Sequence, residues 1–203
     1  MPRPAAANES KWSTLVLGFV LVITMTMGAF QLIALAVVAN DLTDDLAITT
    51  ALFGAATAVN TIVGALFAPR SGHITDRIGP KRSVVLVIVI ASIGMFLTAV
   101  ASNAVMLVAA SAVSGFGQGW CNPATNKLIA DRVPSGRQGT LTGIKQSGVQ
   151  LGAFLAGATL PTLASAFGWR WGMAGYAMAA LVAAVVAQVM LPADAGRPAS
   201  VAG

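Results

Sequence analysis

Long apolar runs separated by short polar segments make up most of the chain. A bilayer core about 30 Å thick is crossed by about 20 apolar residues of helix, and several runs reach or approach that length. The pattern predicts an all-α membrane protein with six transmembrane helices, at residues 13–39, 46–68, 83–101, 104–130, 141–163 and 169–191. We expect three parts: a cytoplasmic N-terminal segment (1–12), the six-helix bundle (13–191) and a disordered cytoplasmic tail rich in Pro, Ala and Gly (192–203).

The composition also indicates a membrane protein. Hydrophobic residues make up 56% of the chain and charged residues only 9%, whereas ordinary soluble domains have about 45–50% and about 25%. The 21 glycines favour close helix packing in lipid. The first apolar run is longer than the apolar part of a cleaved signal peptide. We therefore expect a multi-pass protein whose main surroundings are the lipid bilayer of the plasma membrane.

The charged residues predict the orientation of the helices. Lys and Arg are retained in cytoplasmic loops, and the connections of this chain alternate between basic and non-basic ones. Segments 70–82 and 127–137 are basic, whereas segment 40–45 has three acids and no base. With both termini cytoplasmic, Arg170 is the only one of the 12 Lys and Arg residues on the outer side. Because the charges follow membrane topology in this way, we expect no nucleic-acid partner.

Few residues suit a metal, a cofactor or a disulfide. The chain has one Cys and one His, whereas zinc sites need several Cys, His or carboxylate ligands. The single cysteine, Cys121, cannot form an internal disulfide. No acidic residue falls within the six predicted helices, so a carboxylate proton relay cannot be housed in them. We expect neither a metal site nor a cofactor.

The segment SGHITDRIGPKR at 71–82 contains residues that are not needed to hold a loop on the cytoplasmic side of the membrane. Positive charge alone would anchor the loop, but it explains neither Gly72 nor Asp76, which lie four residues apart and share one helix face. A bare glycine beside a carboxylate would let another helix approach, and the carboxylate could cap that helix or pair with an arginine. The segment ADRVPSGR at 130–137 weakly resembles residues 75–82 of the same chain. Weak internal similarity of this kind is found in transporters built from inverted three-helix repeats.

Residues 72–82 resemble the loop motif of the major facilitator superfamily. That motif reads Gly, three residues, Asp-Arg, one residue, Gly and then two basic residues, and it stands between the second and third helices. Its counterparts here are Gly72, Asp76, Arg77, Gly79, Lys81 and Arg82. Pro80 occupies a position that is usually basic, and Gly115 stands where many proton-driven antiporters carry an arginine. The resemblance covers residues 13–191 and implies one bundle of 3+3 inverted repeats, the first half of a twelve-helix transporter.

The resemblance also implies candidate residues. The family builds its cavity from the first, second, fourth and fifth helices of each half, so their deep polar side chains are candidates for substrate contact: Gln31, Asn60, Gln118, Asn122, Lys145 and Gln146. Interhelical hydrogen bonding is the alternative for the deep amides, and snorkelling to the inner surface is the alternative for Lys145. Three glycines of the fifth helix are expected to allow close packing: Gly148, Gly152 and Gly157. The third helix has almost no deep polar atom and is expected to face lipid.

The leading function is transport of a small solute by alternating access, with the motif at 72–82 as the conformational switch. The solute would be an organic anion, which Lys145 favours, or a drug-like compound. Because the resemblance covers one half of the family fold, the chain is expected to be a half-length unit or a fragment, and a second six-helix half or a homodimer would be needed. The alternative is a non-transporting membrane protein, such as a channel subunit or an intramembrane enzyme. A serine protease needs a base near its nucleophile, and Ser114 has only the loop residue His73, so we expect no catalytic residue.

Overall fold

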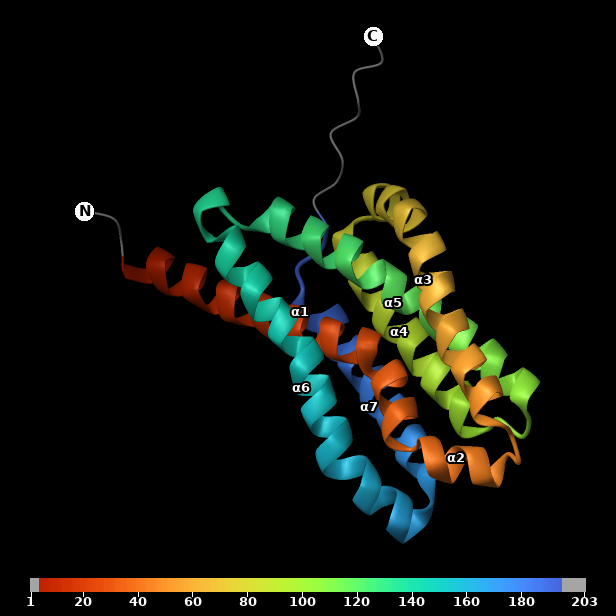
Figure 1. The fold of residues 1–203 in the computed structure, drawn as a ribbon. Coiled ribbons are helices and arrows are strands. Elements are labelled where there is room, and N and C mark those ends of the chain that lie inside the picture. Colours follow the sequence, from red (N-terminus) through yellow and green to blue (C-terminus); the bar gives the residue numbers. More distant parts are fainter. Residues whose placement is uncertain (1–3, 195–203) are drawn as a thin grey trace.

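The computed structural model describes the backbone of residues 4–194 and the side chains of residues 14–194. This part of the chain folds into helices alone: α1 Pro4–Val37, α2 Ala39–Asp45, α3 Thr50–Ile78, α4 Pro80–Ala99, α5 Ala104–Arg132, α6 Ser135–Phe167 and α7 Trp169–Met190. The long helices form one elongated bundle, with α2 at the end opposite to the α3–α4 and α5–α6 connections (Figure 1). Residues 195–203 of the predicted tail lie outside the described residues.

The six predicted membrane helices are confirmed. Six helices of the described chain are long and apolar enough to cross a membrane: Thr14–Val37, Thr50–Ile78, Pro80–Ala99, Ala104–Arg132, Ser135–Phe167 and Trp169–Met190. Their bounds differ from the prediction at the basic end, where α3 runs ten residues past Ala68 and α6 begins six residues before Leu141. The prediction ended each helix where the apolar run meets its first polar residues, whereas the backbone hydrogen bonds of the helix continue through them. The short helix α2 was not predicted.

Gly79 separates α3 from α4. Its φ of 93° lies in the left-handed region, where side chains other than hydrogen are strained. Pro80 occupies the first position of α4, where its missing N–H costs no helical hydrogen bond. The two residues therefore turn the chain sharply and start the next helix.

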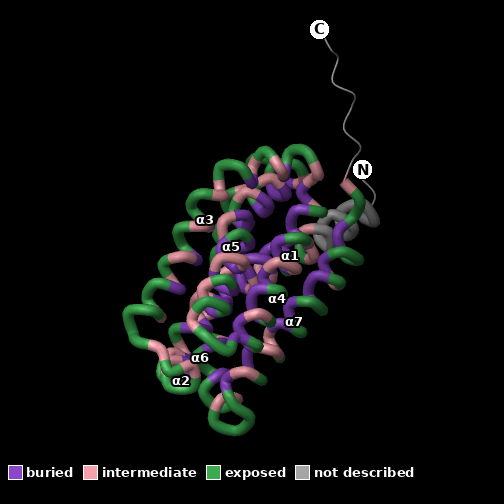
Figure 2. Tube along the Cα trace, turned by 90° about the vertical axis from the view of Figure 1, so that its right-hand side faces the viewer, coloured by how far each residue is buried: buried purple, intermediate pink, exposed green. Residues whose placement is uncertain are grey.

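The helix contacts follow a repeated pattern. α1 packs along α6, α3 packs along α5, and α4 packs along both α5 and α7. When α1, α3 and α4 are compared with α5, α6 and α7, the first helix of each triplet packs on the second helix of the other. This agrees with the predicted 3+3 repeat. Figure 2 shows the buried residues concentrated on the inner helices, with many exposed residues along α3; α3 and α6 are the least buried of the long helices.

The expectation that the third helix faces lipid is wrong for most of its surface. Val87, Ile88 and Met95 of α4 are fully buried, and the Ser92 hydroxyl donates a 2.7 Å hydrogen bond to the Ala177 carbonyl of α7. One apolar stripe of α4 is exposed, formed by Leu86, Ile93 and Phe96, and Val100 just after the helix continues it. Since lipid and a packed helix are both apolar, the sequence pattern cannot distinguish the two surroundings.

Arg170 fastens the end of the bundle that carries α2. Its guanidinium pairs with Asp45 at 2.8 Å, donates to the carbonyls of Ala99 and Ala101, and lies 4.6 Å from the ring centre of Trp169. The start of α7 is thereby tied to α2 and to the α4–α5 connection.

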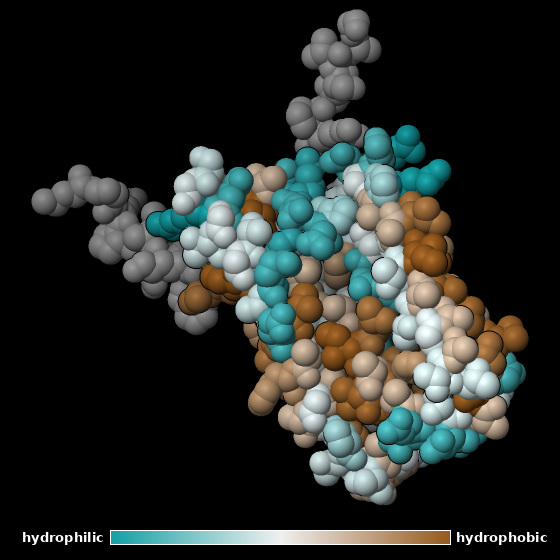
Figure 3. All heavy atoms as spheres, viewed as in Figure 1, coloured by the Kyte–Doolittle hydropathy of each residue, from teal (hydrophilic) through white to brown (hydrophobic). Residues whose placement is uncertain are grey.

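The surface of the bundle is apolar between two hydrophilic ends. Figure 3 shows hydrophilic residues at the end that carries the basic segments and near α2, with hydrophobic residues between them. A hydrophilic strip also descends from the basic end over α6 into the apolar region (Figure 3). Gln146 is an exposed polar residue of α6. One face of the bundle therefore departs from a surface suited to lipid.

Candidate functional site

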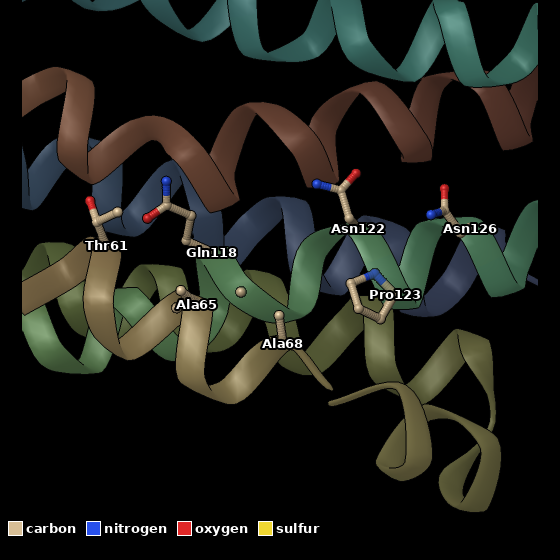
Figure 4. A pocket seen from close by; sticks show the side chains of 9 residues that line it. Thr61, Ala65, Ala68, Gln118, Asn122, Pro123 and Asn126 are labelled. Carbon is tan, nitrogen blue, oxygen red and sulfur yellow. The ribbon is translucent and has the colours of Figure 1, made fainter. Parts of the chain in front are cut away.

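A row of amide side chains follows one face of α5. Gln118, Asn122 and Asn126 are spaced four residues apart, which places them on one side of a helix, and Figure 4 shows them projecting together. They border a groove of about 470 Å³ between α3 and α5. The groove is lined by Thr61, Gly64, Ala65, Ala68, Gln118, Gly119, Asn122, Pro123 and Asn126. Most of the lining side chains are small, so the amides dominate its polar character.

Glycines set the separation of the two helices beside the groove. A Cβ added to Gly119 would lie only 2.8 Å from the Gly64 Cα, and one added to Gly64 would lie 3.0 Å from the Gly115 carbonyl oxygen. Backbone therefore meets backbone at this crossing, as in other membrane helix pairs built on small residues. Nearby, the Trp120 indole donates a 2.7 Å hydrogen bond to Thr75 of α3.

Lys145 reaches the same amides from α6. Its side chain does not snorkel to the surface, because only 1% of the residue is exposed. Its ammonium donates to the Asn122 oxygen at 3.1 Å, the Thr125 hydroxyl at 3.0 Å and the Asn126 oxygen at 2.6 Å. Lys145 and Asn122 were singled out from the sequence separately, and the fold brings them together.

Gln31 and Asn60 lie apart from the groove, in a buried network. Each is 1% exposed. The Asn60 amide donates to the Gln31 oxygen at 3.0 Å and to the Ser111 carbonyl at 3.1 Å, and Gln31 donates to the Thr98 hydroxyl at 3.1 Å. The network joins α1, α3, α4 and α5. These contacts are the interhelical hydrogen bonds expected as the alternative to substrate contact.

The glycines of α6 differ in their surroundings. A Cβ added to Gly148 would lie 3.1 Å from the Met25 Cβ, and one added to Gly152 would lie 3.4 Å from the Thr26 carbonyl oxygen. The Thr26 hydroxyl also donates a 2.7 Å hydrogen bond to the Gly148 carbonyl. Gly157 has no neighbouring atom within 4 Å of such a Cβ. The first two glycines thus serve the α1–α6 contact, and Gly157 does not.

The motif at 72–82 spans the end of α3 and the start of α4. Asp76 pairs with Lys127 of α5 at 3.4 Å, and Lys127 also pairs with Asp131 at 3.3 Å. A Cβ at Gly72 would meet no atom within 4 Å, so this side of α3 is open beside the carboxylate. Arg77 and Arg82 are exposed.

Asp194, which the sequence did not single out, is bonded to the motif. Its carboxylate accepts a 3.1 Å hydrogen bond from the Lys81 backbone N–H and pairs with Arg132 at 3.5 Å. Lys81 and Arg132 also donate to backbone carbonyls between Leu191 and Ala193. The segment after α7 is therefore bonded to the start of α4 and to the end of α5. Asp194 is far from Lys81 and Arg132 in the sequence and meets them only in the folded chain. No local sequence pattern could therefore have predicted these contacts.

The sequence profile of the Major Facilitator Superfamily matches residues 17–203. The chain belongs to the major facilitator superfamily. It is 27% identical over 137 residues to the hexuronate transporter of Bacillus subtilis, covering 68% of this chain and 32% of that protein. It is 29% identical over 150 residues to the gentisate transporter of Corynebacterium glutamicum, covering 72% of this chain and 32% of that protein.

A solved structure of a superfamily transporter has the same fold. The bacterial homologue of the human lysosomal transporter Spinster, in its inward-facing unoccupied conformation, superposes with a TM-score of 0.77 and 19% identity. The match covers 91% of this chain and 44% of that one. The chain thus spans about a third of the two curated relatives and under half of the solved transporter. The predicted family and six-helix fold are confirmed.

The structure does not assemble the catalytic pair that an intramembrane serine protease requires. The Ser114 hydroxyl is buried and has no hydrogen-bond partner among the described residues, and His73 is exposed with its ring beside the Pro69 carbonyl. No group of three His, Cys, Asp or Glu side chains that could hold a metal occurs within residues 14–194. The relatives reported above are transporters.

Proposed function

We propose that this superfamily chain is one six-helix half of a plasma-membrane carrier that moves a small solute by alternating access. A second six-helix bundle completes it. In such carriers two bundles rock around a site near the bilayer midplane. The groove on α3 and α5 and the amides beside it form the contribution of this half to that site.

The observation that carries this proposal is the polar face of an otherwise apolar bundle. Asn122, Asn126 and Gln146 are exposed on helices long enough to span a bilayer. Asn122 lies five residues before Lys127, where the basic segment begins, or about 7.5 Å along the helix. A polar side chain exposed there costs free energy in hydrocarbon unless it faces a partner or a wet cavity. A facing bundle and a water-filled cavity between the two remove that cost.

The lining of the groove suits two solute classes. Gly64, Ala65 and Ala68 leave room for an apolar, drug-like body. Lys145 supplies positive charge beside Asn122, which favours an organic anion. The relatives named for hexuronate and gentisate support the second class, because both compounds carry a carboxylate. Asp76 beside the open Gly72 serves as the contact that holds the second bundle in one conformation.

A cysteine placed at Ala65 tests for the water-filled face. Ala65 is an exposed groove residue, so Ala65→Cys is expected to react in native membranes with a water-soluble maleimide. The native Cys121 is buried and gives little background. Val185→Cys on α7 is the matched control, because Val185 is 59% exposed on an apolar surface suited to lipid. Equal protection of both cysteines from the maleimide would contradict the proposal.

Reporter fusions test the orientation that goes with this function. A fusion after Asp45 is expected to report the outer side of the membrane, and a fusion after Gly79 the cytoplasmic side. The physical reason is the retention of Lys and Arg in cytoplasmic loops. Matching signals from the two fusions would overturn the topology with both termini cytoplasmic.

A further inference from the structure

The ammonium of Lys145 is buried without a countercharge. Lys145 as a whole is 1% exposed, and its ammonium donates to three neutral oxygens, on Asn122, Thr125 and Asn126. No carboxylate within residues 14–194 pairs with it. The three hydrogen bonds satisfy its donors but leave its net charge in place. A buried charge that is solvated only by dipoles is costly, so a nearby anion would be stabilised.

The same hydrogen bonds fix how the two asparagines are turned. An ammonium has no acceptor, so the atom of Asn122 and Asn126 that faces Lys145 is the amide oxygen. The amide nitrogens are thereby directed away from Lys145, and Figure 4 shows both of them on the side that faces Gln118. Neither nitrogen donates a hydrogen bond within the described part of the chain. Two N–H donor groups, polarised by the ammonium behind them, are left available.

Both asparagines line the groove between α3 and α5. Its volume of about 470 Å³ falls within the range of small-molecule pockets, about 300–1,000 Å³. Gly119 and the alanines Ala65 and Ala68 leave the space in front of the amides free of large side chains. The groove therefore joins small-residue walls to a pair of donors backed by positive charge.

We propose that this groove is a carboxylate site, in which the amide nitrogens of Asn122 and Asn126 bind the two oxygens of an organic anion. Lys145 does not contact the anion. It orients the two amide groups through their oxygens, and its positive charge compensates the negative charge of the anion. This inference rests on the proposed function, because the groove must be open to water between two bundles. Of the two solute classes in the proposed function, a carboxylate site favours the organic anion over the drug-like compound.

The test measures maleimide labelling of Ala65→Cys with and without a ligand. The probes are 4-hydroxybenzoate and phenol, which differ by one carboxylate, and inorganic phosphate. At ten times its dissociation constant, 4-hydroxybenzoate is expected to slow labelling about tenfold, whereas phenol and phosphate leave the rate unchanged. Equal protection by phenol, or protection by phosphate alone, would overturn the carboxylate site. A cysteine that never reacts would instead count against the water-filled face itself.

Asn122→Asp tests the donors. The variant keeps the shape of the side chain, but its carboxylate pairs with Lys145 and offers no N–H to a ligand. In the Ala65→Cys background it is expected to abolish protection by 4-hydroxybenzoate, and Asn126→Asp is expected to do the same. Thr142→Asp is the control, because it adds a negative charge to the exposed side of α6 outside the groove, and protection is expected to persist. Full protection in both asparagine variants would refute the assigned contacts.

Discussion

Gly119→Ala is expected to lower the unfolding temperature of the purified chain in detergent and to reduce its amount in the membrane. The new Cβ would lie 2.8 Å from the Gly64 Cα, and the atoms it meets belong to the backbone of α3, which cannot rotate away. Forcing an extra carbon into a packed contact costs about 1–3 kcal/mol. Because α3 packs chiefly on α5, the helix would shift as a whole and the groove beside it would change shape.

Gly157→Ala provides the matched control. It makes the same substitution inside a membrane helix, but a Cβ at Gly157 meets no atom within 4 Å. Its unfolding temperature is expected to equal that of the parent or to rise, since alanine is more favourable than glycine in a helix by about 0.5–1 kcal/mol. Equal unfolding temperatures for both variants would show that the crossing at Gly119 tolerates a side chain, and that the glycines do not set the helix separation.

The order of the helices was predictable because it depends on local chemistry. Crossing a bilayer requires about 20 mostly apolar residues of helix, and the six segments reach or approach that length. The break between α3 and α4 is equally local, since it follows from the backbone preferences of Gly79 and Pro80. The motif around Asp76 was found for the same reason, because its spacing lies within one helix turn and one loop.

Features that depend on long-range contacts were missed. The burial of α4 could not be read from its sequence, because apolar residues suit both lipid and neighbouring helices. Lys145 was identified as a candidate residue from the sequence. Its partner Thr125, which is 20 residues away along the chain, was not identified. Asp194 meets Lys81 across 113 residues. In each case the partners lie on different segments that meet only in the folded chain, and the spacing of residues along the sequence carries no information on such contacts.

Asp76→Asn is expected to abolish solute flux through the assembled carrier while leaving insertion and abundance unchanged. The carboxylate is 55% exposed and its pair with Lys127 spans 3.4 Å. An exposed ion pair of this kind contributes at most about 1 kcal/mol to folding, so the bundle should remain intact. What the variant loses is the charge that Asp76 offers to a facing bundle beside the open surface of Gly72. Uptake of a labelled organic acid into membrane vesicles, together with immunoblotting, measures the two effects separately.

Asp131→Asn separates the role of Asp76 in the conformational switch from the general charge of this end of the bundle. Asp131 pairs with the same Lys127 at 3.3 Å, and its side chain is 40% exposed, but it lies on α5 rather than beside Gly72. Its removal changes the net charge by the same amount and leaves Asp76 in place, so flux is expected to be retained. Equal loss of flux in both variants would indicate that only the local charge balance matters. Parental flux in Asp76→Asn would remove the carboxylate from the conformational switch, because a contact that holds one state of a carrier cannot be deleted without shifting the balance between states.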